Sequence, residues 1–188
     1  MGSKADLNRQ HIIDTADHLF YRQGFEHTSF SDIADAAGIA RGNFYYYFKT
    51  KDDLLGAVLV ARSEGIKNML QDWDAQMPDP RQRLKRYIQI LTNSQHEIKE
   101  FGCPMGSLCT ELAKLRHALQ FNANDMFDIF RSWLVTQFSQ LGHTQEAEHL
   151  ALHLIARSQG IAMVVNTYQD PAFLEREVQD LNHWIEQL

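Results

Sequence analysis

The chain has 188 residues, of which 44% are hydrophobic and 22% charged, a composition typical of one large or two small globular domains. A net charge of −6 excludes a protein that is basic over its whole surface, but it allows positive charge to gather in one patch. Two cysteines are too few for a disulfide scaffold. The N-terminus lacks the apolar segment of a secretory signal, and no apolar run approaches the ~20 residues that span a bilayer. We therefore expect a soluble, cytoplasmic protein that does not enter the membrane.

Helical periodicity runs through the sequence, and no segment has the period-two alternation of a strand. Glycine, proline and capping residues divide this pattern into segments of helical length. Nine helices are predicted, over about residues 5–23, 30–37, 41–48, 50–77, 80–100, 105–117, 121–141, 144–168 and 171–188. The expected fold is all-α, with a three-helix unit over residues 1–50 and a larger helical unit over residues 51–188. The long fourth helix joins the two.

The second and third predicted helices, separated by a short turn containing Gly38, form a helix-turn-helix pattern. In this motif the second helix of the pair enters the major groove of DNA. Helical geometry places Phe44 and Phe48 on one side, where they can anchor the helix in a small core. Three successive tyrosines cannot all be buried as well. The remaining surface offers a glycine, an amide and phenols: Gly42, Asn43, Tyr45, Tyr46 and Tyr47.

Local charge also favours a nucleic-acid surface at this helix. Residues 36–51 contain no acidic side chain, but they include Arg41, Lys49 and Lys51. Lys51 follows Thr50 at a predicted helix N-terminus, a place that attracts phosphate. Residues 1–55 as a whole are slightly acidic, so the DNA-binding surface has to be local.

Residues 28–54, TSFSDIADAAGIARGNFYYYFKTKDDL, resemble the DNA-binding signature of the tetracycline-repressor-like (TetR) family. The resemblance implies a homodimeric transcriptional regulator, usually a repressor, that binds a palindromic DNA operator and responds to a small molecule without a cofactor. The resemblance assigns roles to two sets of residues. Thr28, Tyr47 and Lys51 resemble the family's phosphate contacts. The positions that resemble those facing bases or the flanking backbone are Arg41, Gly42, Asn43, Tyr45 and Tyr46.

Two positions within this signature have alternative interpretations. Lys49 is as readily a solvated lysine as a phosphate contact. Ala40 departs from the family pattern, which often has Ser or Thr there to cap the third helix and touch phosphate. A helical hairpin with all of its aromatic residues in the core is the structural alternative for the whole segment.

The last two helices are amphipathic, and we expect them to form the dimer interface, chiefly because of the family resemblance. The same stripes could instead cover the core of one subunit. The stripe residues are Ala147, Leu150, Ala151, Leu154, Ile155, Ser158, Ile161, Ala162, Val165, Phe173, Val178, Leu181, Trp184, Ile185 and Leu188.

The middle helices supply candidates for an effector pocket, and their methionines and aromatic residues suit an apolar or aromatic effector. Each candidate is also an ordinary core residue when considered alone. The candidates are Tyr87, Leu91, Met105, Leu108, Leu112, Phe127, Phe130, Met163 and Asn166.

Cys103 lies in GCPMG, which resembles a loop-to-helix junction found in part of the family, and a thiol at a helix N-terminus can sense oxidants or electrophiles. A structural role is the alternative for both cysteines. Cys109 is six residues away, ~9 Å along a helix, which is beyond disulfide reach unless the helix breaks. Glu146, His149 and His153 share a helical face that could hold a metal, but a solvated face is favoured and no metal site is predicted.

Two other classes of protein are alternatives to a DNA-binding regulator. A thiol-dependent helical enzyme would use Cys103, but the sequence offers it neither a general base nor a C-x-x-C motif, so no catalytic residues are predicted. A dimeric ligand carrier without DNA activity would not need the acid-free helix.

Overall fold

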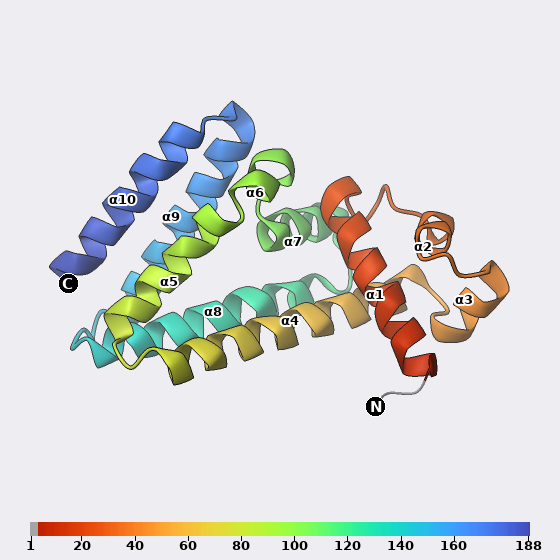
Figure 1. Cartoon of the computed structure of the whole chain (residues 1–188), viewed down its shortest axis with the longest axis horizontal. Coiled ribbons are helices and arrows are strands. Elements are labelled where there is room, and N and C mark those ends of the chain that lie inside the picture. The colour runs from red at the N-terminus through yellow and green to blue at the C-terminus, as the bar shows by residue number, and fades with distance from the viewer. Residues whose placement is uncertain (1–3) are drawn as a thin grey trace. The chain divides into compact units, whose positions relative to one another are not determined.

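The computed structural model describes residues 4–188, apart from the side chain of Arg41, and confirms the all-α class (Figure 1). None of the helices in this range combines the length and the apolar character needed to cross a membrane. The described helices are α1 (Lys4–Gln23), α2 (Phe30–Ala36), α3 (Arg41–Tyr47), α4 (Lys51–Gln76), α5 (Pro80–Asn93), α6 (Gln95–Phe101), α7 (Pro104–Leu115), α8 (Gln120–Gln140), α9 (Ala147–Tyr168) and α10 (Pro171–Gln187).

The single helix expected over residues 80–100 is divided at Ser94 into α5 and α6. Ser94 leaves helical geometry with φ −106° and ψ 19°, although its N–H still donates to the carbonyl of Ile90. Leu91 and Ile98 on either side of the break are both buried and lie seven residues apart, a spacing that a continuous helix also gives. The apolar pattern therefore carries no sign of the break.

The chain forms two compact units, one of residues 4–65 and 107–126 and the other of residues 66–106 and 127–188. The division differs from the expected boundary between residues 50 and 51. The helix-turn-helix unit also includes the start of α4, most of α7 and the start of α8, because side chains of α7 and of the turn after it contact the turn between α1 and α2.

The first unit has a core that α1, α2, α3 and α4 all supply. The buried side chains include Ile12, Ile13, Ala16, Phe20, Ile33, Ala34, Phe44, Leu54, Leu55 and Val58. Gly24 follows α1 with φ +86°, a left-handed conformation that glycine adopts readily at the end of a helix. This core fixes the direction in which α3 presents its remaining side chains.

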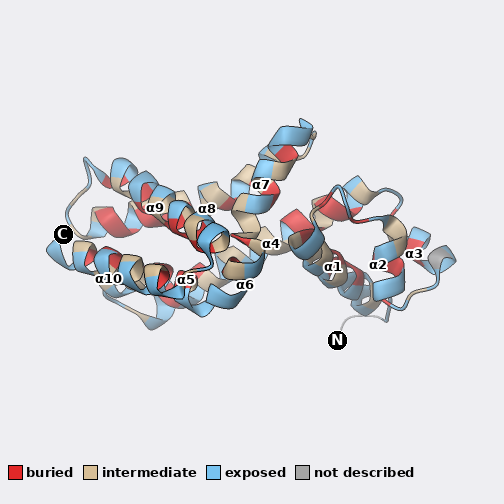
Figure 2. Ribbon diagram, turned by 90° about the horizontal axis from the view of Figure 1, so that it is seen from above, coloured by how far each residue is buried: buried red, intermediate tan, exposed pale blue. Residues whose placement is uncertain are grey.

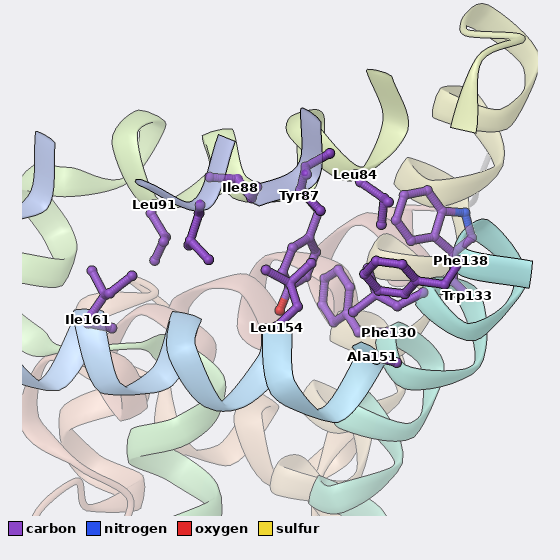
Figure 3. Packing of buried hydrophobic residues seen from close by; sticks show 14 of the residues in the cluster. Leu84, Tyr87, Ile88, Leu91, Phe130, Trp133, Phe138, Ala151, Leu154 and Ile161 are labelled. Carbon is purple, nitrogen blue, oxygen red and sulfur yellow. The ribbon is translucent and has the colours of Figure 1, made fainter. Parts of the chain in front are cut away.

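In the second unit α5 packs against α10 and α6 against α9. Figure 3 shows buried side chains of α5 meeting those of α8 and α9. The rings of Tyr87 and Phe130 meet edge to face with centroids 5.4 Å apart, and those of Trp73 and Trp133 do so at 5.8 Å. Aromatic contacts of this geometry add to the stabilisation that burial itself provides.

The stripe predicted for the dimer interface on α9 lies in this core. Its members at one side of α9 are buried within the subunit: Ala147, Ala151, Leu154, Ser158, Ile161, Ala162 and Val165. The stripe on α10 behaves in the same way at Leu181 and Ile185. The alternative that these stripes cover a subunit's own core is therefore the one that applies to these residues.

Candidate nucleic-acid interface

The helix α3 divides into the two faces that its sequence predicts. Phe44 and Phe48 are buried, and Phe44 meets the ring of Phe30 of α2 edge to face with centroids 5.0 Å apart. Gly42 and Asn43 are exposed on the opposite side. Figure 2 shows most of α3 in the exposed colour. Burial of two large rings thus fixes α3 in the unit and leaves its other face open.

The three tyrosines of α3 differ in their surroundings. Tyr45 is 52% exposed and stacks on Phe30, with ring centroids 5.6 Å apart and planes 18° apart. Tyr46 is 75% exposed and touches the ring of Tyr47 edge on at 5.3 Å. Tyr47 is partly buried, and its hydroxyl accepts a hydrogen bond of 3.2 Å from the Asn8 side chain of α1. Tyr45 and Tyr46 are therefore the phenols best placed to reach a partner.

The start of α3 lacks a side-chain cap, as expected for alanine at position 40. The Ala40 side chain makes no cap at the start of the helix. At the other end, the exposed Lys49 ammonium donates to the carbonyl of Tyr45 at 2.6 Å, where a positive charge also suits the helix dipole. The side chain of Arg41 lies outside the described residues. Lys49 thus places a positive charge at the C-terminal edge of the exposed face of α3.

Thr28 is placed differently from the phosphate contact that the resemblance implies. Its side chain is fully buried, and its hydroxyl donates to the carbonyl of Gly24 at 2.6 Å. A buried hydroxyl that is already committed to a backbone carbonyl cannot reach a phosphate in this conformation. The structure gives Thr28 a role in closing the turn between α1 and α2.

Lys51 also has an internal role where a phosphate contact was expected. Its ammonium donates to the carbonyls of Phe25 at 2.9 Å, Thr28 at 3.2 Å and Glu26 at 3.4 Å. An ammonium has three N–H donors, and three carbonyls receive them. Lys51 therefore holds the turn that precedes α2.

Capping boxes begin both α2 and α4. The Ser29 hydroxyl accepts the N–H of Asp32 at 3.1 Å, and the Asp32 carboxylate accepts the N–H of Ser29 at 2.8 Å. Hydrogen bonds to the Asp32 carboxylate, first from the Ser29 side chain and then from the Ser29 N–H, lower the pKa of Asp32 below its usual value. Thr50 and Asp53 form the matching pair at 3.0 Å in both directions. These boxes fix where the helices on either side of α3 begin.

The residues expected to line an effector pocket lie in both units. Leu108 and Leu112 are buried in the first unit, whereas the other seven belong to the second. Tyr87, Leu91 and Phe130 are buried there, and Met105, Phe127 and Asn166 are partly buried. Met163 is 67% exposed on α9. Met163 was expected to line a pocket, but its side chain faces solvent in this subunit.

Two polar groups among these candidates have internal partners. The Tyr87 hydroxyl is bonded with Ser158, and burial raises the pKa of this phenol well above its usual value. The Asn166 amide donates to the carbonyl of Lys99 at 2.9 Å, near the end of α6. Tyr87 and Ser158 form a polar pair inside a mainly apolar core.

Cys103 and Cys109 are both free thiols. The Cys103 sulfur accepts the N–H of Gly106 at 3.4 Å in the first turn of α7. Cys109 donates to the carbonyl of Ala123 at 3.4 Å, within the first unit. No group of three potential metal ligands occurs among the described residues.

The contacts that sequence reasoning missed all join residues far apart in the chain. The bond from Asn8 to Tyr47 spans 39 residues, and Lys51 reaches back 26 residues to Phe25. Glu111 accepts N–H groups from the same turn across 85 and 86 residues. No local pattern marks such pairs.

An exposed, acid-free helix presented by a helix-turn-helix unit is the arrangement that DNA-binding transcriptional regulators use. The model of the bacterial regulatory proteins of the tetR family matches residues 12–58. An uncharacterized HTH-type transcriptional regulator from Lactococcus lactis is 28% identical over 172 residues, which cover 89% of this chain and 87% of the relative. The regulator AcrR of Shigella flexneri is 37% identical over 86 residues, 45% of this chain and 40% of AcrR.

Solved structures show the same fold. A TetR transcriptional regulator from Legionella pneumophila, 24% identical, covers 100% of this chain and 97% of its own, with a TM-score of 0.82. One from Cytophaga hutchinsonii, 20% identical, covers 100% and 98% with a TM-score of 0.84. Residues 12–58 therefore match the tetR family of bacterial regulatory proteins, and the whole chain has the fold of solved TetR regulators.

Proposed function

We propose that the protein is a homodimeric repressor that binds a palindromic operator and releases it when an apolar or aromatic small molecule binds. The observation that carries this proposal is the outward face of α3, where Tyr45 and Tyr46 are exposed beside Asn43. Phenols and an amide can donate to and accept from base edges and phosphates. No acidic residue between positions 36 and 51 would repel the DNA backbone.

The exposed side of α9 supports a two-fold assembly. Leu152 and Met163 are 48% and 67% exposed, and the small residues Ala156 and Gly160 lie exposed between them at spacings of four, four and three residues. These spacings place all four on one side of the helix. Small residues allow a second helix to approach closely, so this side of α9, opposite the core stripe, is the interface that we propose.

The oligomeric state tests the proposed interface directly. Met163→Glu introduces a charge on this side of α9 without touching the core, and we expect the dimer to dissociate. Lys67→Glu changes an exposed residue on α4 and serves as the control. Light scattering after size-exclusion chromatography gives the mass of each variant. A wild-type protein of 21.7 kDa, or a dimer that withstands Met163→Glu, would contradict the interface.

The core of the second unit supports a small-molecule site. Tyr87 and Ser158 provide a polar pair among buried apolar and aromatic side chains, and such a combination is typical of ligand pockets. The two α3 helices of a dimer have to meet major grooves ~34 Å apart. A ligand that changes the spacing of the two helices by a few ångströms prevents both from binding, which releases the operator.

DNA binding is tested with duplexes selected from a randomised pool by the wild-type protein. Tyr46→Ala should weaken binding to the selected duplex by about tenfold or more, because each good base-edge contact contributes about 1–3 kcal/mol. Tyr168→Ala removes an equally exposed tyrosine from α9 and should leave the affinity unchanged. Fluorescence anisotropy gives the dissociation constants. Equal affinities of the two variants would contradict the assignment of α3 as the reading helix.

A second candidate function is a thiol-based sensor at Cys103. The observation that favours it is the position of the Cys103 sulfur at the start of α7, where it accepts the N–H of Gly106 at 3.4 Å. N-Ethylmaleimide, to which the sulfur adds across the double bond, should then weaken DNA binding of the wild type and of Cys109→Ser, but not of Cys103→Ser. Equal effects on all three proteins would dismiss the sensor.

A further inference from the structure

We infer that Glu111 is a positioning residue for DNA binding, through a carboxylate of α7 that is seated on backbone N–H groups of the turn between α1 and α2. The N–H groups that donate to Glu111 belong to the turn between α1 and α2, not to α3. The inference rests on the proposed function, because a positioning role for Glu111 requires that α3 binds DNA. All of the contacts that carry it lie within the first unit.

Both carboxylate oxygens of Glu111 are engaged by consecutive N–H groups. Phe25 donates to Oε2 and Glu26 donates to Oε1, each at 2.9 Å. Hydrogen bonds to an ionised acceptor are stronger than neutral ones, and a bidentate pair also fixes the direction of approach. One side chain of α7 therefore determines where this turn lies.

Gly24 makes room for the carboxylate. Its φ of +86° belongs to the region that favours glycine, and it turns the next two N–H groups toward α7. A Cβ atom at this position would lie 3.0 Å from Oε1 and 3.3 Å from Oε2 of Glu111. The turn is thus shaped to receive the carboxylate in two independent ways, by its conformation and by its missing side chain.

Lys51 binds the same turn through its carbonyl groups. Its ammonium donates to three carbonyls between Phe25 and Thr28 and lies 4.2 Å from the centre of the Phe25 ring. The peptide groups of the turn therefore have a negative charge near their N–H groups and a positive charge near their oxygens. This arrangement favours a single position of the turn.

A second contact links the turn to the end of the α7 segment. His117, two residues after α7, meets the Phe25 ring edge to face with centroids 5.1 Å apart. Its Nε2 lies 3.3 Å from a carboxylate oxygen of Asp52 in the first turn of α4. Glu111 and His117 thus hold Phe25 by its backbone and by its ring.

The held turn leads directly into the DNA-binding helices. It ends at Ser29, the cap of α2, and Phe30 in the first turn of α2 supports both Phe44 and Tyr45 of α3. The helix that carries Glu111 begins at Pro104 in the second unit. A displacement of α7 therefore acts on the turn through the Glu111 carboxylate, and the turn carries it to α3.

The experiment compares Glu111→Gln with Glu64→Gln, a matched change at an exposed glutamate of α4. Glutamine keeps the size of the side chain, but it replaces one acceptor oxygen by an N–H₂ group and removes the charge. Hydrogen–deuterium exchange of the full-length proteins should show the Phe25 and Glu26 amides exchanging about tenfold faster in Glu111→Gln alone. Glu111→Asp, which restores the charge on a shorter side chain, should recover part of the protection.

Affinity for the selected duplex completes the test, at a temperature well below thermal unfolding. Glu111→Gln should bind several-fold more weakly, whereas Glu64→Gln should bind like the wild type. Unchanged exchange at Phe25 and Glu26 would overturn the carboxylate contact. Faster exchange with unchanged affinity would overturn its role in positioning. A wild type that selects no duplex would refute the proposed function, and the exchange rates would still report on Glu111.

Discussion

The ring of Tyr45 on α3 stacks on the ring of Phe30 on α2, with centroids 5.6 Å apart and an angle of 18° between their planes. The same Phe30 ring meets the buried Phe44 ring edge to face. A side chain of α2 therefore supports the exposed face of α3 from one side and anchors its buried face from the other.

Phe30→Ala should weaken DNA binding even though Phe30 lies on the helix that precedes α3. Tyr45 loses the surface on which it stacks, so ordering its side chain on DNA costs more entropy. We expect a loss of several-fold in affinity for the selected duplex, measured by anisotropy. Phe173→Ala, at a similarly half-buried phenylalanine of α10, serves as the control. An affinity as high as that of the control variant would show that the stack does not matter.

The faces of α3 could be predicted from the sequence because they depend on local geometry alone. Phe44 and Phe48 are four positions apart, and both are buried as helical spacing requires. The roles of Thr28 and Lys51 could not be predicted in this way. Their partners are carbonyl groups, which every residue carries, and only the conformation of the turn brings those carbonyls within reach.

The two sides of α9 show a different limit of the sequence. Leu154 and Ile161 are buried in the core, whereas Leu152 and Met163 on the other side are exposed. All four are apolar, so hydrophobic periodicity cannot tell which side meets the subunit's own core. The choice is made by the packing of α9 against α6, which no pattern within α9 records.

Ser29→Ala should destabilise the protein by about 1 kcal/mol, the usual effect of losing an N-terminal cap. It should also change the response to acid. The lowered pKa of Asp32 contributes stability that is present above the ordinary carboxyl pKa and is lost as pH falls through the lower folded value. Without the Ser29 hydroxyl, which is the main cause of the lowering, this acid-dependent loss should shrink.

Urea unfolding at neutral pH and at about pH 3 measures both effects of the Ser29 change. Ser31→Ala alters a serine in the same turn of α2 and is the control. Identical acid dependence in Ser29→Ala and the wild type would mean that the hydroxyl does not set the Asp32 pKa.

Asp74→Ala should destabilise the second unit by about 1–3 kcal/mol, because it removes the acceptor of a buried indole N–H. Trp133 Nε1 donates to both carboxylate oxygens of Asp74, at 3.0 and 3.1 Å. Asp72→Ala removes an exposed carboxylate from the same helix and should cost far less. Thermal unfolding followed by tryptophan fluorescence compares the two. Equal costs would show that solvent replaces Asp74 as the partner of the indole.

Tyr87→Phe should change the alkaline limit of stability. Burial raises the pKa of Tyr87 in the folded protein above its ordinary value near 10, so the folded state holds the phenol proton more tightly than the unfolded chain does. The resulting contribution is complete below about pH 10 and is lost as pH rises further, because ionisation then favours the unfolded chain. Phenylalanine has no proton to lose, so Tyr87→Phe should lack this part of the alkaline destabilisation. Its stability at neutral pH should fall by about 1 kcal/mol through loss of the bond with Ser158.

Stopped-flow jumps to alkaline pH test this directly through absorbance at 295 nm, where tyrosinate absorbs. The tyrosinate signal that Tyr87→Phe lacks should appear in the wild type at the rate of unfolding, which tryptophan fluorescence reports in the same experiment. Tyr168→Phe removes an exposed phenol instead. An exposed phenol ionises within the mixing time, so this variant should lose only tyrosinate absorbance that appears before the first measured point. If the Tyr87 contribution also appeared within the mixing time, the phenol would be open to solvent, and the buried pair with Ser158 could not serve as the polar point of an effector site.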